Sequence, residues 1–454
     1  MQTSIVARHC QPLSAMPSSS PPHRLARLVS RLLAGATDIR RGEGRDVLVA
    51  GLLFFLILSA MMVLRPVREA MGLKHGVENV RRLFLCTVGA TVVLVPAFGY
   101  LVSRMPRRAF LSVSFRCCGL ILLGFYLVLT QMPRPIAEFF APVYYVSYSV
   151  INLFVVSLFW ALMADLFHAA ESKRLFPAIA VGGTLGAITG SLVAELFAQQ
   201  SAGHIGWLFL ISVAQLELAV WIAALVTRMR TPQTRAPAEA RPIGGHPLGA
   251  VVEIVRSPYL MGIGLFILLG AMISAFFYLT GMRIVAAAAG TDQQRTMLFA
   301  QINVWTQVAT LLAQAFVAGR IMRLIGVGSA LAVLPVCSAA GFQVLALTPT
   351  LTAYMLINAT YRAAQRGIAR PAQETLFTVV PREEKYKAKS FLDTFVFRAG
   401  DASGAQLERP LVAAGLKLAG LATAVLPIAL GWAALCLALG VAQSRRARRE
   451  AQKP

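Results

Sequence analysis

The chain has 454 residues, of which 57% are hydrophobic and 14% are charged, and its formal net charge is +23. Soluble domains carry roughly 25% charged residues, so the composition excludes a water-soluble globular protein. Apolar runs of about 20 residues recur along the sequence, and each is long enough to cross ~30 Å of hydrocarbon as a helix. We therefore expect an all-α polytopic membrane protein.

The apolar runs fall into two sets separated by a polar segment. After a basic tail at 1–46, a first half at 47–227 holds six predicted spans, at about 47–66, 83–103, 109–130, 140–165, 175–198 and 206–227. A linker at 228–257 begins with a stretch rich in Pro, Arg and Gly. A second half at 258–442 holds six more, at about 258–280, 297–319, 327–347, 351–379, 390–415 and 419–442, before a basic tail at 443–454.

Lysine and arginine concentrate in alternate loops, on the side that also bears both tails. Because cytoplasmic loops carry the excess of these residues, we expect both termini in the cytoplasm of a bacterial inner membrane, with the lipid bilayer as a partner. The same rule accounts for most of the net positive charge, so we expect no nucleic acid polymer as a partner. One outer loop departs from the rule, since Arg65, Arg68 and Lys74 follow the first span.

Two local patterns refine the predicted fold. The segment Gly99–Arg108 after the second span resembles the degenerate signature of the major facilitator superfamily, with Ser103 in place of the usual Asp. Together with the six-plus-six division, it favours the major facilitator fold, and we expect a monomer. In the fifth span, Gly182, Gly186 and Gly190 share one helix face, which predicts close packing against a neighbouring helix.

The tenth span carries a column of charge, with Arg362, Arg366 and Arg370 at intervals of four. Successive members rotate by only ~40°, so the three guanidiniums are expected on one face, and that face cannot contact lipid. Pro371 predicts a kink, and Glu374 is placed to pair with Arg370. Two interpretations stay open: a buried ion-pair ladder between helices, or a cavity that binds an anion.

Further charges flank this column. The eleventh span and the segment before it contribute Lys387, Lys389, Asp393, Arg398 and Asp401. Lys389 and Asp393 are spaced for a pair within one helix. The lysines are also explained as a plain cytoplasmic anchor.

The outer end of the first span adds Arg68 and Glu69. Three basic clusters suit a solute that bears phosphate or carboxylate, because arginine binds such groups with two parallel hydrogen bonds and lysine as a point charge.

Three segments resemble the ATP/ADP translocase family of nucleotide exchangers, in particular its bacterial facilitator-like members. They are Leu64–Gly72, Ser157–Ser191 and Arg370–Ala405. The second contains the "LFW" element and the Lys-Arg-aromatic-Pro turn, and the third contains the Lys-x-Lys that precedes Leu-Asp. The resemblance implies that Arg68 and Lys387 or Lys389 contact the substrate. The acidic residues that the family uses in helix 4 and near the start of helix 8 are not matched here.

These observations favour a secondary transporter of a small organic anion, such as a nucleotide or another phosphorylated metabolite, working by alternating access. The alternative is a proton-coupled exporter of drugs or metabolites, for which Asp165, Glu195 and Glu217 are the candidate acids. No metal-ligand spacing or nucleophile–base motif is present, so we expect no enzyme activity, no catalytic residue, no metal and no cofactor.

Overall fold

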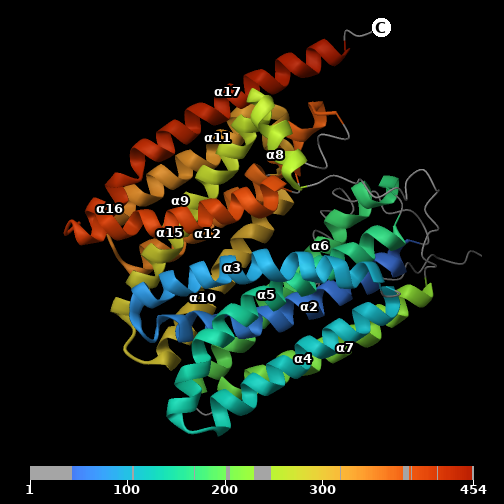
Figure 1. Ribbon diagram of the computed structural model, residues 1–454, viewed down its shortest axis with the longest axis vertical. Helices are drawn as coiled ribbons and strands as arrows, with labels where there is room; N and C mark the ends of the chain where they lie inside the picture. Colours follow the sequence, from blue (N-terminus) through green and yellow to red (C-terminus); the bar gives the residue numbers. More distant parts are fainter. Residues whose placement is uncertain are drawn as a thin grey trace, which may run out of the picture.

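The computed structural model describes residues 43–104, 107–167, 169–200, 205–229, 247–316, 318–381, 388–389, 391–416 and 418–451. Across these residues the chain is almost entirely helical, and the helices form two bundles that lie side by side (Figure 1). Residues 1–42 of the predicted N-terminal tail, the turn at 105–106 within the facilitator-like signature, the linker residues 230–246 and Lys387 lie outside the described residues. The predicted C-terminal tail is described up to residue 451, where it continues the last helix.

The first bundle contains six long helices, one for each predicted span of the first half. They are α2 (Gly44–Leu73), α3 (Gly76–Arg104), α4 (Arg107–Gln131), α5 (Arg134–Leu166), α6 (Ala169–Gln200) and α7 (Trp207–Met229).

The second bundle contains the remaining elements, some of them interrupted. They are α8 (Pro247–Arg256), α9 (Pro258–Ala288), α10 (Asp292–Phe316), α11 (Ala318–Leu347), α12 (Leu351–Ala364), a π-helix at Gln365–Ala369, α13 (Arg370–Leu376), a 3-10 turn at Phe377–Val379, a second π-helix at Leu392–Val396, α15 (Phe397–Ala413), α16 (Leu418–Ala424) and α17 (Leu426–Ala451).

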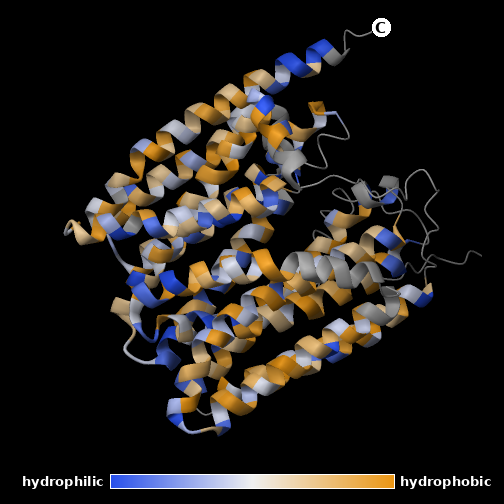
Figure 2. Ribbon diagram, viewed as in Figure 1, coloured by the Kyte–Doolittle hydropathy of each residue, from blue (hydrophilic) through white to orange (hydrophobic). Residues whose placement is uncertain are grey.

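Eight of the described helices are long and apolar enough to cross a membrane: α2, α4, α5, α6, α7, α9, α11 and α17. The other four predicted spans coincide with α3, α10, α12 with α13, and α15. Figure 2 shows apolar residues along most of the helix surfaces and hydrophilic residues at many of the helix ends. This pattern fits a protein whose sides contact lipid.

Local sequence explains where several helices begin. Ser257 caps α9 by accepting a hydrogen bond from the backbone N–H of Leu260, and Pro258 occupies the first turn, where its missing N–H is harmless. Thr350 caps α12 in the same way through Ala353. Within the predicted linker at 228–257, residues Pro247–Arg256 form the amphipathic helix α8.

The expected glycine packing is present, and the structure identifies the partner. A Cβ placed on Gly182, Gly186 or Gly190 would overlap the backbone of α2, so the two helices meet along their main chains. The second bundle repeats the arrangement, since Gly400 and Gly404 of α15 lie against the backbone of α9. Small residues allow such close approach in membranes. Each bundle therefore contains a helix pair in close contact through glycines.

The two bundles contact each other at the ends that lie away from the linker. Gln301 of α10 donates to Glu195 of α6 at 3.0 Å, and Gln293 donates to the backbone of Ala198 at 2.8 Å. Tyr145 of α5 hydrogen-bonds Tyr278 of α9 at 3.0 Å. The bundles spread apart toward the end where α8 and the C-terminus lie (Figure 1). In the predicted topology, which has both termini in the cytoplasm, the end at which the bundles spread apart is the cytoplasmic end.

Candidate substrate-binding cavity

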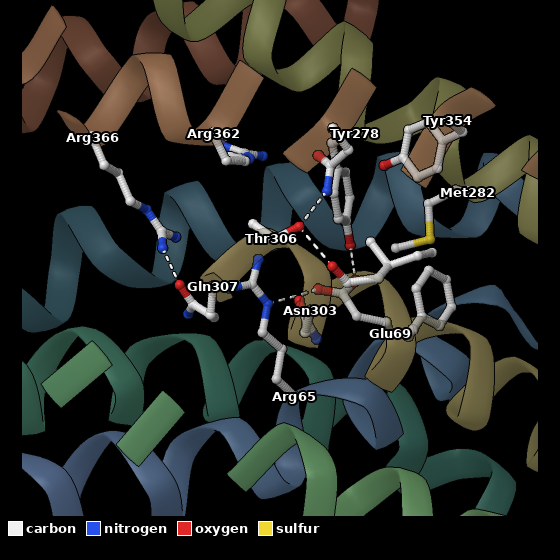
Figure 3. Close-up of a pocket in the computed structure, with 13 residues that line it drawn as sticks. Arg65, Glu69, Tyr278, Met282, Asn303, Thr306, Gln307, Tyr354, Arg362 and Arg366 are labelled. Atoms are coloured by element: carbon white, nitrogen blue, oxygen red, sulfur yellow. Dashed lines mark hydrogen bonds and ion pairs between the residues drawn. The ribbon is translucent and has the colours of Figure 1, made fainter. Parts of the chain in front are cut away.

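A cavity with an empty volume of about 510 Å³ lies between the two bundles. The first bundle contributes Arg65 and Glu69 of α2. The second contributes side chains of α9, α10, α12 and the first π-helix: Tyr278, Met282, Phe299, Ile302, Asn303, Thr306, Gln307, Tyr354, Asn358, Arg362 and Arg366. Figure 3 shows Arg362 and Arg366 projecting from one side and Arg65 from the other. We call this space the central cavity.

Arg366 is bound by a neutral group. Its Nη1 donates to Oε1 of Gln307 on α10 at 2.6 Å (Figure 3), and within the described residues no carboxylate lies within 4.0 Å of it. Arg366 stands fifteen residues from the start of its helix at Leu351, or roughly 22 Å along it, near the middle of the span predicted at 351–379. A guanidinium at this depth requires a polar partner. Its positive charge is left uncompensated.

Arg362 lies one turn away and is bound in a similar way. Its Nη1 donates to Gln365 at 3.0 Å and to Ser274 of α9 at 3.3 Å, both of them uncharged. Among the described residues, it too has no carboxylate within the distance of an ion pair. The ion-pair ladder between helices is therefore absent at these two arginines.

The acid of the central cavity is already shared among several partners. Glu69, whose side chain is 4% exposed, pairs with Arg68 at 2.9 Å and with Arg65 at 3.7 Å. The hydroxyl of Tyr278 donates to its other carboxylate oxygen. Because Tyr278 belongs to the second bundle, this cluster joins the two halves. Glu69 leaves the charges of Arg362 and Arg366 unbalanced.

Arg68 lies beside the central cavity rather than in it. Its guanidinium stacks on the ring of Tyr145, 3.6 Å from the centroid, and donates to Ser149 at 2.9 Å. With Glu69 as a third partner, Arg68 is a well-satisfied part of the contact between the two bundles. The resemblance to the translocase family implies contact with substrate, and the structure shows these protein contacts.

Arg370 does not continue the column, which corrects the expectation of one shared face. Its side chain is 54% exposed and lies outside the central cavity, 3.8 Å from Glu374 and 3.6 Å from Asp393. The π-helix at Gln365–Ala369 is the cause, because its wider turn holds one extra residue and rotates the next helical turn by about 100°. The distortion expected at Pro371 thus takes the form of a π-helix just before it.

The charges beyond Arg370 form ion pairs between helices. Lys389 pairs with Glu374, and Gln373 donates to Asp393 at 3.4 Å. The predicted pair between Lys389 and Asp393 within one helix is therefore replaced by contacts to the tenth span. At Arg370, Glu374, Lys389 and Asp393 the charges do form ion pairs that join two helices, as the ladder interpretation expects. Arg398 and Asp401 form a further pair at 3.2 Å, within α15 rather than between helices.

A second space adjoins the central cavity, with an empty volume of about 770 Å³. It is lined by Arg65, Arg68, Phe84, Thr87, Val88, Tyr148, Ser149, Asn152, Leu153 and Arg398. Arg65 borders both spaces. We call the second space the side lobe.

The sequence did not single out the neutral polar lining of the central cavity. Asn303, Thr306 and Gln307 fall at positions i, i+3 and i+4 of α10, and Asn358 donates to Thr306 at 2.8 Å from α12. Amide and hydroxyl groups on one face of an apolar helix are a readable signal for a polar cavity. Arg65 and Tyr278 depend on how the two halves meet, so sequence patterns carry no signal for their roles.

The acids considered for a proton-coupled exporter lie elsewhere. Glu217 forms an ion pair with Arg116 at 2.8 Å on the outside of the bundle, with both side chains near half exposed. Glu195 accepts a hydrogen bond from Gln301 of the other bundle, and Asp165 is at the end of α5. None of the three lines the central cavity.

Several solved structures share this architecture. No family model matches the sequence, and no curated protein matches it. Among solved structures, the nucleoside transporter NupG aligns with 88% of this chain and 98% of its own at 15% identity and a TM-score of 0.58. The POT family transporter PepTSo aligns with 90% of this chain and 99% of its own at 11% identity and a TM-score of 0.59.

A bacterial homologue of the human lysosomal transporter Spinster, solved in an inward-facing and unoccupied conformation, covers 90% of this chain and 98% of its own at 14% identity, with a TM-score of 0.53. At such low identity these likenesses establish the fold and no more. The chain is an all-α polytopic membrane protein with the major facilitator fold.

Proposed function

We propose that this protein is a secondary transporter that moves a small organic anion across a bacterial inner membrane by alternating access, and that it is not an enzyme. The observation that carries the proposal is the pair Arg362 and Arg366, two guanidiniums in the central cavity that are bound by neutral groups. With Arg65, three cations line this space against the one carboxylate of Glu69. A negatively charged solute supplies the missing charge.

The chemistry of the two arginines favours phosphate or carboxylate as the anionic group. A guanidinium presents planar paired donors that match these oxygens, and such hydrogen bonds are shorter and stronger than neutral ones. Two guanidiniums one helical turn apart suit a group with two negative charges. The resemblance of Leu64–Gly72 and Arg370–Ala405 to the ATP/ADP translocase family supports a nucleotide or another phosphorylated metabolite.

The position of the cavity supports alternating access. Substrate sites of major facilitator transporters lie near the midplane between two halves that rock against each other. Here the halves are joined at one end by Glu69, Tyr278 and Tyr145, and they diverge at the other. Both termini then lie in the cytoplasm, and one chain forms the complete pathway.

The test is uptake of labelled ATP, ADP and inorganic phosphate into proteoliposomes loaded with each compound in turn. Uptake that requires an internal phosphate compound is the expected result and identifies an exchanger. Uptake into empty liposomes instead identifies a uniporter or an ion-coupled carrier of the same anion. No uptake of any of the three in any loading contradicts a phosphorylated substrate.

A further inference from the structure

The side lobe next to the central cavity has a different chemistry from the cavity itself. Its walls include the rings of Phe84 and Tyr148 and the aliphatic side chains of Val88 and Leu153. Its hydroxyl groups are already engaged, since Thr87 donates to the backbone of Leu83 at 2.8 Å and Ser149 to that of Tyr145 at 2.8 Å. The lobe therefore offers flat apolar surfaces and little free hydroxyl.

One amide in this lobe lacks a partner. The side-chain Oδ1 of Asn152 is buried and accepts no hydrogen bond within the described residues. Buried polar atoms are nearly always paired. Asn152 as a whole is only part-buried and lines the lobe, so a rotation of its side chain brings this unpaired amide to a hydrogen-bond donor of a ligand. Asn152 belongs to α5, one turn from Tyr148 and Ser149, and all three line the lobe.

Two of the three arginines that line the lobe are each paired with a carboxylate. Arg68 is neutralised by Glu69 at 2.9 Å, and Arg398 by Asp401 at 3.2 Å. Arg362 and Arg366 have no such partners in the described structure. The guanidiniums without a carboxylate partner therefore lie in the central cavity, and Arg65, which shares Glu69 at 3.7 Å, lines both spaces.

We infer that the side lobe binds the uncharged part of the substrate, a planar ring that bears a hydrogen-bond donor, with Asn152 as the residue that selects it. The inference rests on the proposed function, because the anionic group of the same molecule binds at Arg362 and Arg366. The ring packs against Phe84 and Tyr148, where flat aromatic faces stack favourably. The substrate class is thus an organic phosphate or carboxylate with a hydrogen-bonding ring.

Equilibrium binding to the purified full-length protein tests this with three probes: inorganic phosphate, phenyl phosphate and adenosine 5′-monophosphate. Asn152→Leu removes the amide and keeps its size, so it weakens binding of the adenosine compound by about 3- to 10-fold and leaves the other two unchanged. The matched control is Asn303→Leu in the central cavity, which weakens all three.

The outcomes separate the two proposals. If Arg366→Gln abolishes binding of the adenosine compound while Asn152→Leu leaves it unchanged, the role of the side lobe is wrong and the anion site stands. If no probe binds, or Arg366→Gln changes nothing, both proposals fail. If Asn152→Leu does not fold, Leu153→Trp tests the same lobe by filling it. That variant must weaken binding of the adenosine compound and leave binding of inorganic phosphate unchanged. If it binds the adenosine compound as tightly as the wild type does, the inference is contradicted.

Discussion

The guanidinium of Arg366 donates to the amide oxygen of Gln307 across 2.6 Å, from a π-helix to the neighbouring helix α10. An amide orients the guanidinium without cancelling its charge. The contrast is Arg370, four residues later, which lies 3.6 Å and 3.8 Å from two carboxylates. The same residue type therefore serves two purposes within one turn: Arg366 faces the cavity as a free charge, and Arg370 connects helices.

Arg366→Gln is expected to weaken binding of organic phosphates by about 10- to 150-fold, because it removes a charged hydrogen-bond donor worth about 1.5–3 kcal/mol. The variant should fold normally, since Arg366 is bound by one neutral partner. Equilibrium binding and thermal unfolding of the purified protein measure both effects. Arg370→Gln is the control, with affinity near that of the wild type. A large loss of stability in Arg366→Gln would show that the arginine is structural.

Gln307→Glu is expected to give a more specific result. It places a carboxylate beside Arg366, so the cation acquires an internal partner and no longer needs an anionic solute. We expect affinity for organic phosphates to fall at least tenfold while the melting temperature stays the same or rises. An anion that binds equally well to this variant would contradict our assignment of the site.

Tyr278→Phe is expected to loosen the outer contact between the halves, because its hydroxyl donates to Glu69 and lies 3.0 Å from that of Tyr145. The outward-facing state should become more populated, by up to the 1.5–3 kcal/mol of a hydrogen bond to a charged group. Spin labels at Phe139 and Ala288, on exposed parts of the two halves, measure the distance between the halves at this end, which should increase.

The control for this experiment is Tyr354→Phe. Tyr354 lines the same cavity, and its hydroxyl makes no hydrogen bond across the halves in the described structure. An unchanged distance distribution in Tyr278→Phe, or an equal shift in both variants, would show that this cluster is not the outer closure.

Gly186→Ala is expected to destabilise the protein by about 1–3 kcal/mol, because the added methyl group would overlap the backbone of Phe55 on α2. Gly124→Ala is the matched control in α4, where a Cβ would meet nothing within 4 Å. There alanine should be neutral or stabilising by up to ~1 kcal/mol. Thermal unfolding in detergent compares the two, and equal melting temperatures would contradict the tight α2–α6 packing.

The helices could be predicted from the sequence because lipid imposes one simple demand, about 20 apolar residues per span. The glycine face at Gly182, Gly186 and Gly190 was readable for a similar reason, since small residues at intervals of four mark a close approach. The helix α8 was missed because Pro and Gly precede it, although its own residues are amphipathic.

The site could be predicted only in part. A charge in an apolar helix must face protein or water, and this rule correctly indicated that Arg362 and Arg366 line a cavity. The expectation that Arg370 shares their face was wrong, because no residue pattern predicts the π-helix that rotates this side chain away from the cavity. Gln307 and Tyr278 are far in the sequence from their partners Arg366 and Glu69. These contacts depend on how the helices pack, which the periodicity of the sequence does not reveal.

The central claim is that the uncompensated charge of Arg366 binds the transported anion. Exchange of labelled ADP in ADP-loaded proteoliposomes tests it most directly, with wild type, Arg366→Gln and Arg370→Gln reconstituted at equal density. We predict exchange by the wild type and Arg370→Gln, and a loss of at least tenfold in Arg366→Gln with its fold intact. Equal exchange by Arg366→Gln and the wild type would contradict the account.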